Sequence, residues 1–213
     1  MSILWILRLS DITLLLLMVF LFAYFLKNRS KYDSLLENKS ANLFTVLLYQ
    51  LLCYFPAILP SDLAVFSKPY ILKSVLVIIW FIILGFIFIF FGATLMIITI
   101  IKRKAIGGQD TEGKLLTDGF YSFCRHPIYL GISFMALGLA IVFINFDGLL
   151  VIPAIIAVNL IEGKLEELYD LRQRFKQQYI NYKKEVKMFG PIWFNILILC
   201  LIFFPIGIGI VSI

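Results

Sequence analysis

Residues 115–131 read LLTDGFYSFCRHPIYLG, and they place the only histidine of the chain, His126, where a polar segment meets an apolar one. A proline suits the first turn of a helix, where its missing N–H is not needed, so we predict an apolar helix that begins near Pro127. Ionisable side chains at membrane depth are energetically costly, and by default they mark a functional site. Arg125 and His126 are therefore the leading candidate site residues.

The composition of the whole chain predicts an integral membrane protein. Of its 213 residues, 62% are hydrophobic, whereas a soluble domain has about 45–50%. An apolar segment of about 20 residues is long enough to cross a bilayer. The fold class we predict is all-α, a polytopic transmembrane bundle of about five to six spans with a cytoplasmic amphipathic helix. The expected apolar spans are about 4–26, 41–59, 70–101, 127–144, 149–161 and 192–213.

We expect one membrane domain over residues 1–213. It divides into N-terminal spans (1–101), a core with the candidate site (102–191) and an additional apolar segment (192–213). Residues 12–26 resemble the core of a signal peptide, but no small-residue cleavage site follows, so a retained membrane helix is expected. Gly85 and Gly92 indicate a close helix contact in the long third span.

The net charge of +6 is concentrated in polar segments between the apolar ones. Sixteen of the nineteen Lys and Arg residues lie in segments 27–40, 102–126 and 162–188, which the positive-inside rule places in the cytoplasm. The last two segments can then meet, and a water-soluble cofactor can reach them. Such charge suits anionic head groups, so we expect membrane lipids and no nucleic acid as partners. The expected location is the bacterial inner membrane, or the endoplasmic reticulum in a eukaryote.

The cysteines indicate neither a disulfide framework nor a metal site. Cys53, Cys124 and Cys200 are scattered, form no C-x-x-C pair, and have only one histidine to accompany them. Although Cys124 lies beside Arg125, we interpret it as a small buried apolar residue rather than a nucleophile.

Segment 162–188 is charged and has helical periodicity. Its apolar residues recur at intervals of three and four, which predicts an amphipathic helix on the membrane surface. The predicted apolar face consists of Ile161, Leu165, Leu168, Phe175, Tyr179, Tyr182 and Val186. Glu162, Glu166 and Glu167 are unfavourable at an anionic leaflet unless they face a partner, and the first two share one helix face.

Two blocks of sequence together resemble the signature of the integral membrane methyltransferases, which include isoprenylcysteine carboxyl methyltransferase and the phospholipid N-methyltransferases. The first block is Leu116-Thr117-x-Gly119-x-Tyr121 followed by Arg125-His126-Pro127-x-Tyr129-x-Gly131. The second consists of Glu166-Glu167, Phe175, Tyr179, Tyr182, Val186 and Pro191. The resemblance covers about residues 100–191. The family pattern has a glycine at Lys176 and often a proline at Lys187, and its spacing leaves open which of the three acids correspond to the family's pair.

The resemblance implies a methyltransferase that uses S-adenosylmethionine (SAM) and acts on a lipidic or membrane-embedded hydrophobic small molecule. SAM would bind between the helix after His126 and the cytoplasmic helix. The catalytic residues implied are Arg125, His126, Glu166 and Glu167. The cofactor-binding residues implied are His126, Pro127, Tyr129, Leu130, Gly131, Glu162, Tyr179 and Tyr182, and no metal ligand is implied.

The chemistry of these residue types agrees with that implication. Arg125, His126 and a helix N-terminus suit the methionine carboxylate of SAM. A glutamate suits its ribose hydroxyls or its ammonium group, and tyrosine rings suit its adenine or its sulfonium. Methyl transfer needs an acceptor held close and dry. A carboxylate or thiolate acceptor needs no base, whereas an amine must lose a proton, which a glutamate or His126 can assist.

Other interpretations stay open at this point. The acceptor can be a prenylated cysteine, an ethanolamine head group, a thiol or a small hydrophobic acid, and we expect it to arrive between the third and fourth spans. Sterol reductases, which use NADPH, resemble the family around a similar Arg-His-Pro segment, although they are usually larger. A channel, carrier or assembly factor would carry polar residues in several spans, and we find only Gln50, Thr94 and Asn159.

Overall fold

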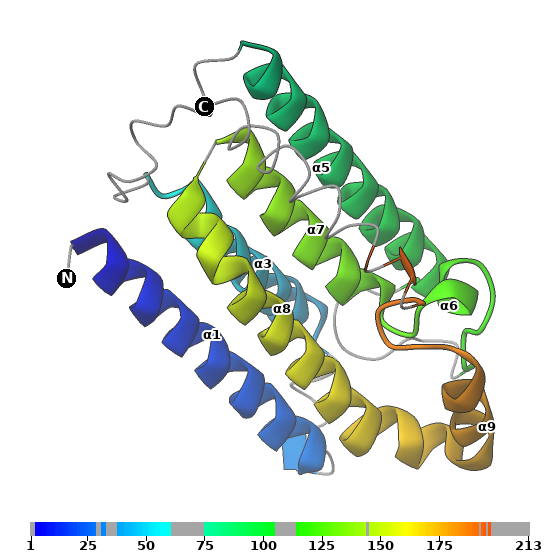
Figure 1. Ribbon diagram of the computed structural model, residues 1–213. Helices are drawn as coiled ribbons and strands as arrows, with labels where there is room; N and C mark the ends of the chain where they lie inside the picture. Colours follow the sequence, from blue (N-terminus) through cyan, green and yellow to red (C-terminus); the bar gives the residue numbers. More distant parts are fainter. Residues whose placement is uncertain are drawn as a thin grey trace.

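The chain folds into an elongated bundle of long helices (Figure 1). The computed structural model describes residues 3–28, 31–32, 38–60, 75–104, 114–143, 145–191, 193–194 and 196. Over these ranges it is helical and contains no strand, so the predicted all-α transmembrane bundle is confirmed. The helices are α1 (Ile3–Lys27), α3 (Lys39–Ile58), α5 (Val75–Arg103), α6 (Phe120–Phe123), α7 (Pro127–Val142), α8 (Phe146–Glu166) and α9 (Arg172–Glu185).

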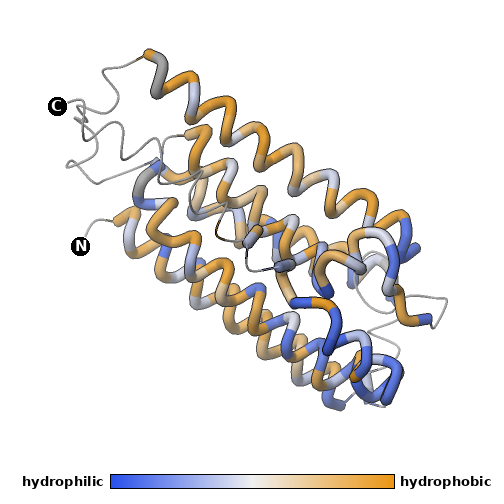
Figure 2. The backbone as a smooth tube through the Cα atoms, turned by 45° about the vertical axis from the view of Figure 1, so that its right-hand side comes forward, coloured by the Kyte–Doolittle hydropathy of each residue, from blue (hydrophilic) through white to orange (hydrophobic). Residues whose placement is uncertain are grey.

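Four of the described helical segments are long and apolar enough to cross a membrane, which makes this a multi-pass membrane protein. They are Ile3–Lys27, Ser40–Ile58, Ile78–Arg103 and Asp147–Glu185. Helix α7 is apolar but shorter, with 16 residues. The expected span at 192–213 lies outside the described residues except for three positions. Figure 2 shows that hydrophilic residues gather at the end of the bundle where α8 continues into α9.

Glycines bring the backbones of α5 and α7 into contact. A Cβ atom added to Gly92 would lie 2.6 Å from the carbonyl oxygen of Gly131, and one added to Gly138 would lie 2.6 Å from that of Gly85. The predicted close contact at Gly85 and Gly92 is therefore confirmed, and its partner is α7. At these glycines no side chain separates the two helices, and the expected acceptor route between the third and fourth spans stays a prediction.

A buried polar cluster ties together the opposite end of the bundle. The Arg8 guanidinium, which is fully buried, donates to the carbonyl oxygens of Leu59 at 3.0 Å and Pro60 at 2.7 Å, and it lies 3.6 Å from the Asp147 carboxylate. The side-chain amide of Asn145 donates to the Ala57 carbonyl oxygen at 2.8 Å. The cluster therefore joins α1, the end of α3 and the start of α8.

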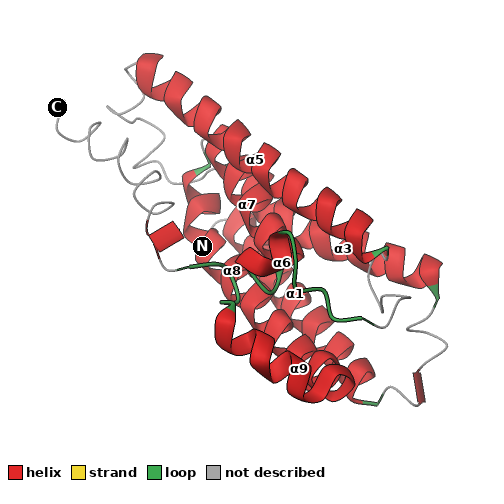
Figure 3. Ribbon diagram, turned by 90° about the vertical axis from the view of Figure 1, so that its right-hand side faces the viewer, coloured by secondary structure: helices red, strands yellow, loops and turns green. Residues whose placement is uncertain are grey.

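The predicted boundary between a fifth span and a separate amphipathic helix, at residue 161, is misplaced. Helix α8 continues through a π-helical turn (Glu167–Leu171) into the start of α9, and the helix is kinked at Lys176, whose φ of 44° is not helical, so that α9 turns away from α8 (Figures 1 and 3). Tyr179 and Tyr182 of the predicted apolar face are buried, as expected. Leu168, predicted on the same face, is instead exposed, and its neighbour Glu167 is buried. A π turn takes more residues per turn than an α-helix, so it changes which side chains face inward.

Candidate functional site

The site forms where the start of α7 meets the end of α8 and the segment after α9. Pro127 occupies the first turn of α7, as predicted, and His126 is the residue that precedes the helix. The backbone N–H groups of Arg125 and His126 donate to the carbonyl oxygens of Lys187 at 3.0 Å and Met188 at 3.2 Å. These bonds hold the two blocks of the sequence motif side by side.

Glu167 is the buried carboxylate at the centre of this junction. Its Oε1 atom accepts from Nε of Arg125 and lies close to the Nη2 atom of the same guanidinium, both at 2.9 Å. The Nε2 atom of His126 lies 3.2 Å from the same oxygen. Lys183 donates to Oε2 at 2.6 Å. Three basic side chains, two of them adjacent in sequence and the third from α9, therefore surround one carboxylate, which balances its charge.

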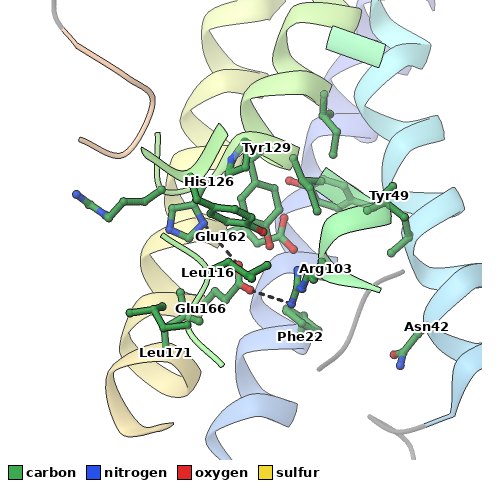
Figure 4. A pocket seen from close by; sticks show the side chains of 18 of the residues that line it. Phe22, Asn42, Tyr49, Arg103, Leu116, His126, Tyr129, Glu162, Glu166 and Leu171 are labelled. Carbon is green, nitrogen blue, oxygen red and sulfur yellow. Dashed lines mark ion pairs between the residues drawn. The ribbon is translucent and has the colours of Figure 1, made fainter. Parts of the chain in front are cut away.

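Glu166 lies on the other side of the imidazole of His126. Its Oε2 atom is 3.6 Å from Nδ1 of His126, and its Oε1 atom is 3.5 Å from the guanidinium of Arg103 (Figure 4). Burial by itself would lower the pKa of His126, but the carboxylates of Glu166 and Glu167 outweigh burial and raise that pKa above its usual value. The imidazole is thus held in a setting that favours its protonated form.

Glu162 lies one helical turn before Glu166 and faces the same cavity. Its side chain is buried, with 9% exposure, and its Oε2 atom accepts no hydrogen bond from the residues that the structure describes. Figure 4 shows it in the cavity near Tyr129 and Tyr49. Of the three candidate acids, it is the one without a basic partner in the described part of the chain.

A cavity joins these groups, and both polar and apolar side chains line it. The polar lining includes His126, Glu162 and Glu166, together with tyrosines of α7 and α9. The apolar lining comes from several helices, through residues such as Phe22 of α1 and Ile132 of α7. A cavity of this kind, at the polar end of a membrane bundle, can hold a polar molecule against the head of a lipid.

The structure brings most of the predicted site residues together. Those that line the cavity are Arg125, His126, Pro127, Tyr129, Glu162, Glu166, Tyr179 and Tyr182. Glu167 contacts them through Arg125 and His126. Leu130 and Gly131 do not line the cavity: Leu130 lies in the apolar core, and Gly131 contacts α5.

The structure directs the donors of Arg125 to groups within the protein. Besides Glu167, its guanidinium donates to the carbonyl oxygen of Val186. Cys124 is fully buried, which confirms its interpretation as a small apolar residue, and burial raises the pKa of its thiol to about 12.

Several residues that line the cavity were not predicted from the sequence, among them Arg103 and Tyr49. In the sequence, Arg103 belongs to the basic end of an apolar span, and Tyr49 is one of many aromatic residues in another span. Neither carries a signal in the sequence that separates it from its neighbours. Asn159 does carry one, because it is a polar residue in an apolar segment one turn before Glu162.

The comparison with protein families agrees with this geometry. The family model described as phospholipid methyltransferase matches residues 70–178, about half of the chain. The matched range contains α5, α7, α8 and every acid of the site. No curated protein and no solved structure matches the chain. The chain therefore belongs to the phospholipid methyltransferase family and is a multi-pass membrane methyltransferase that acts on lipid.

Proposed function

We propose that this protein transfers a methyl group from SAM to the head of a membrane lipid within the cavity. The observation that carries the proposal is that one cavity brings buried acids and His126 together with apolar side chains from several helices. A polar cofactor and an amphiphilic acceptor can meet there without leaving the protein.

The donor and acceptor groups of the cavity fit SAM. The cations His126 and Arg103 suit its carboxylate, and Glu162 offers a carboxylate oxygen that no described residue satisfies. The rings of Tyr129, Tyr179 and Tyr182 suit its adenine. When bound, SAM supplies an electrophilic methyl group on a sulfonium. The chain itself has to bind and orient both SAM and the acceptor, and to keep water away from them.

Arg125 and Lys183 act through Glu167 in this proposal. They hold its carboxylate against His126, and Glu166 holds the other side of the same ring. Because His126 is kept protonated in this way, it can bind an anionic group of the cofactor, but it cannot readily take a proton from the acceptor. An amine acceptor would then lose its proton to a carboxylate, for which Glu162 is the available group.

The lipid acceptor reaches the cavity past Met18 and Phe22 of α1 and Val46 of α3 in this proposal, because glycines hold α5 and α7 in contact. The clustering of basic residues at the same end favours an active site that faces the cytoplasm, in a bacterial inner membrane or the endoplasmic reticulum.

A transfer assay tests the function directly. The purified protein in detergent is incubated with methyl-labelled SAM and total lipid extract, and the labelled lipid is then identified. Thermal unfolding with SAM, S-adenosylhomocysteine or NADPH runs in parallel, because a bound cofactor raises the unfolding temperature. Label in lipid and protection by SAM support the proposal. Protection by NADPH alone, or no labelled lipid, contradicts it.

A further inference from the structure

The charges around Glu162 differ from those around the other acids of the site. Glu166 faces Arg103 and His126, and Glu167 faces three basic groups. Glu162 forms no ion pair within the described ranges, and its Oε2 atom is both buried and without a hydrogen-bond donor. A buried carboxylate without a partner is costly, so this position favours a ligand that brings positive charge.

A hydrogen-bonded chain of buried side chains supports the floor of the cavity beside Glu162. The hydroxyl of Tyr49 donates to the Asn159 side chain at 2.8 Å, and Asn159 donates to the Ser133 hydroxyl at 3.1 Å. The Ser133 hydroxyl donates to the backbone oxygen of Tyr129 at 2.9 Å. The chain holds the Tyr49 hydroxyl in place beside Glu162.

Aromatic rings complete the surroundings of this carboxylate. Tyr49 and Tyr129 come from α3 and α7 and lie near Glu162 in Figure 4. The ring of Tyr129 stacks on His126, with 5.6 Å between the ring centroids, so its orientation is restrained. An anion next to ordered aromatic rings is a typical arrangement for binding ammonium or sulfonium groups.

We infer that Glu162, Tyr49 and Tyr129 form a cation subsite, which takes an ammonium or sulfonium group during methyl transfer. The inference rests on the proposed function for the identity of its ligands. The cation can belong to SAM or to an amine head group of the acceptor. In either case the subsite disfavours a carboxylate acceptor, because an anion next to Glu162 would be repelled.

The test compares Glu162→Gln with the wild-type protein in detergent. The affinities for SAM and S-adenosylhomocysteine are measured by binding, and KM is measured for phosphatidylethanolamine in mixed micelles. If the subsite holds the sulfonium, the variant loses about tenfold or more in SAM affinity but not in S-adenosylhomocysteine affinity. If it holds the cofactor ammonium, both affinities fall. If it holds the acceptor, KM rises by a similar factor while cofactor binding is unchanged.

Glu185→Gln is the matched control, because Glu185 is exposed at the end of α9 and its replacement removes the same charge outside the cavity. Tyr49 supplies a second test that does not alter the carboxylate. Tyr49→Phe keeps the ring and should keep the affinity for the cation, whereas Tyr49→Leu should lower it about threefold or more. Thermal unfolding identifies any variant that does not fold.

A Glu162→Gln protein that matches the wild type in both affinities and in KM overturns the cation subsite. That result leaves the proposed function standing, provided that the wild type binds SAM. A wild-type protein that binds no SAM instead contradicts the proposed function itself.

Discussion

At the scale of single residues, His126 is held between two acids that come from one turn of helix. Its two ring nitrogens lie 3.6 Å from Glu166 and 3.2 Å from Glu167. Adjacent residues on an ordinary α-helix point in different directions. Glu166 is the last residue of α8 and Glu167 the first of the π turn, and their carboxylates lie on either side of one ring.

Arg125 determines where Glu167 lies, so its removal should disable the enzyme. We expect Arg125→Ala to lower the rate of methyl transfer about a hundredfold or more, because a small displacement of the groups around the reacting atoms has an effect of that size. The measurement is the transfer assay on protein purified from membranes. Lys31→Ala removes an exposed cation near the end of α1 and serves as the control. Equal activity in Arg125→Ala and wild type would remove Arg125 from the site.

His126 should also make stability depend on pH. Its pKa is raised in the folded protein, above the usual value of 6.5, by Glu166 and Glu167. The folded state therefore holds the proton more tightly than the unfolded state does. This contribution to stability is complete below pH 6.5 and is lost as the pH rises through the raised pKa.

The unfolding temperature of the wild type in detergent should accordingly fall over that range above pH 6.5. In the His126→Gln variant, the unfolding temperature should depend less on pH over the same range. Identical pH profiles for the two proteins would show that His126 is not the titrating group.

At the scale of elements, α5 and α7 form the most closely packed pair of the bundle, through glycines spaced seven residues apart on each helix. Residues seven apart lie on the same face of a helix, so the two glycines of α5 face the two glycines of α7, Gly85 opposite Gly138 and Gly92 opposite Gly131. Helix α7 begins at the site and α5 ends there with Arg103. The glycine contact therefore sets the distance between Arg103 and the residues before α7.

A side chain at this contact should separate the two helices. We expect Gly92→Leu to lower the free energy of unfolding by about 1–3 kcal/mol or more, as overpacking does. The measurement is denaturant unfolding in detergent micelles. Phe90→Ala, at a position that is 74% exposed on the same helix, serves as the control and should have a smaller effect. A larger loss in the control than in Gly92→Leu would contradict this account of the contact.

At the scale of the whole molecule, the two ends of the bundle have different kinds of polar group. One end holds the site, with its cavity. The other holds the cluster of Arg8, Asn145 and Asp147, whose hydrogen bonds and ion pair lie near the ends of helices. In the proposed function, charge at the first end serves the ligands, whereas charge at the second end joins α1, α3 and α8.

The orientation of the bundle leads to a prediction for the intact cell. We expect a cysteine at position 184, in Lys184→Cys, to react with a membrane-impermeant maleimide in inverted inner-membrane vesicles but not in intact bacterial cells that express the protein. Lys184 is exposed on α9, whereas Cys53 and Cys124 are buried, and Cys200→Ser removes the third thiol. Labelling in intact cells would place the site on the outer side and contradict the positive-inside assignment.

Much of the fold follows from local sequence. Apolar segments long enough to cross a bilayer specify α1, α3 and α5, because the bilayer requires every backbone group to be bonded within its own helix. Pro127 specifies the start of α7, and Gly85 and Gly92 indicate a close contact. Polar residues at the start of an apolar helix identify Arg125 and His126 as the site.

Only the tertiary structure decided the rest. Because a side chain's role depends on residues far away in sequence, spacing alone could not show that Arg125 pairs with Glu167, or that the Oε2 atom of Glu162 is buried without a donor among the described residues. Arg103 and Tyr49 became site residues only when α5 and α3 packed beside α7. The sequence by itself therefore determined a helical membrane protein with its motif, since hydrophobicity and helix starts are local properties. The packing of distant helices decided which of the described charges meet in ion pairs, because those charges come from separate helices.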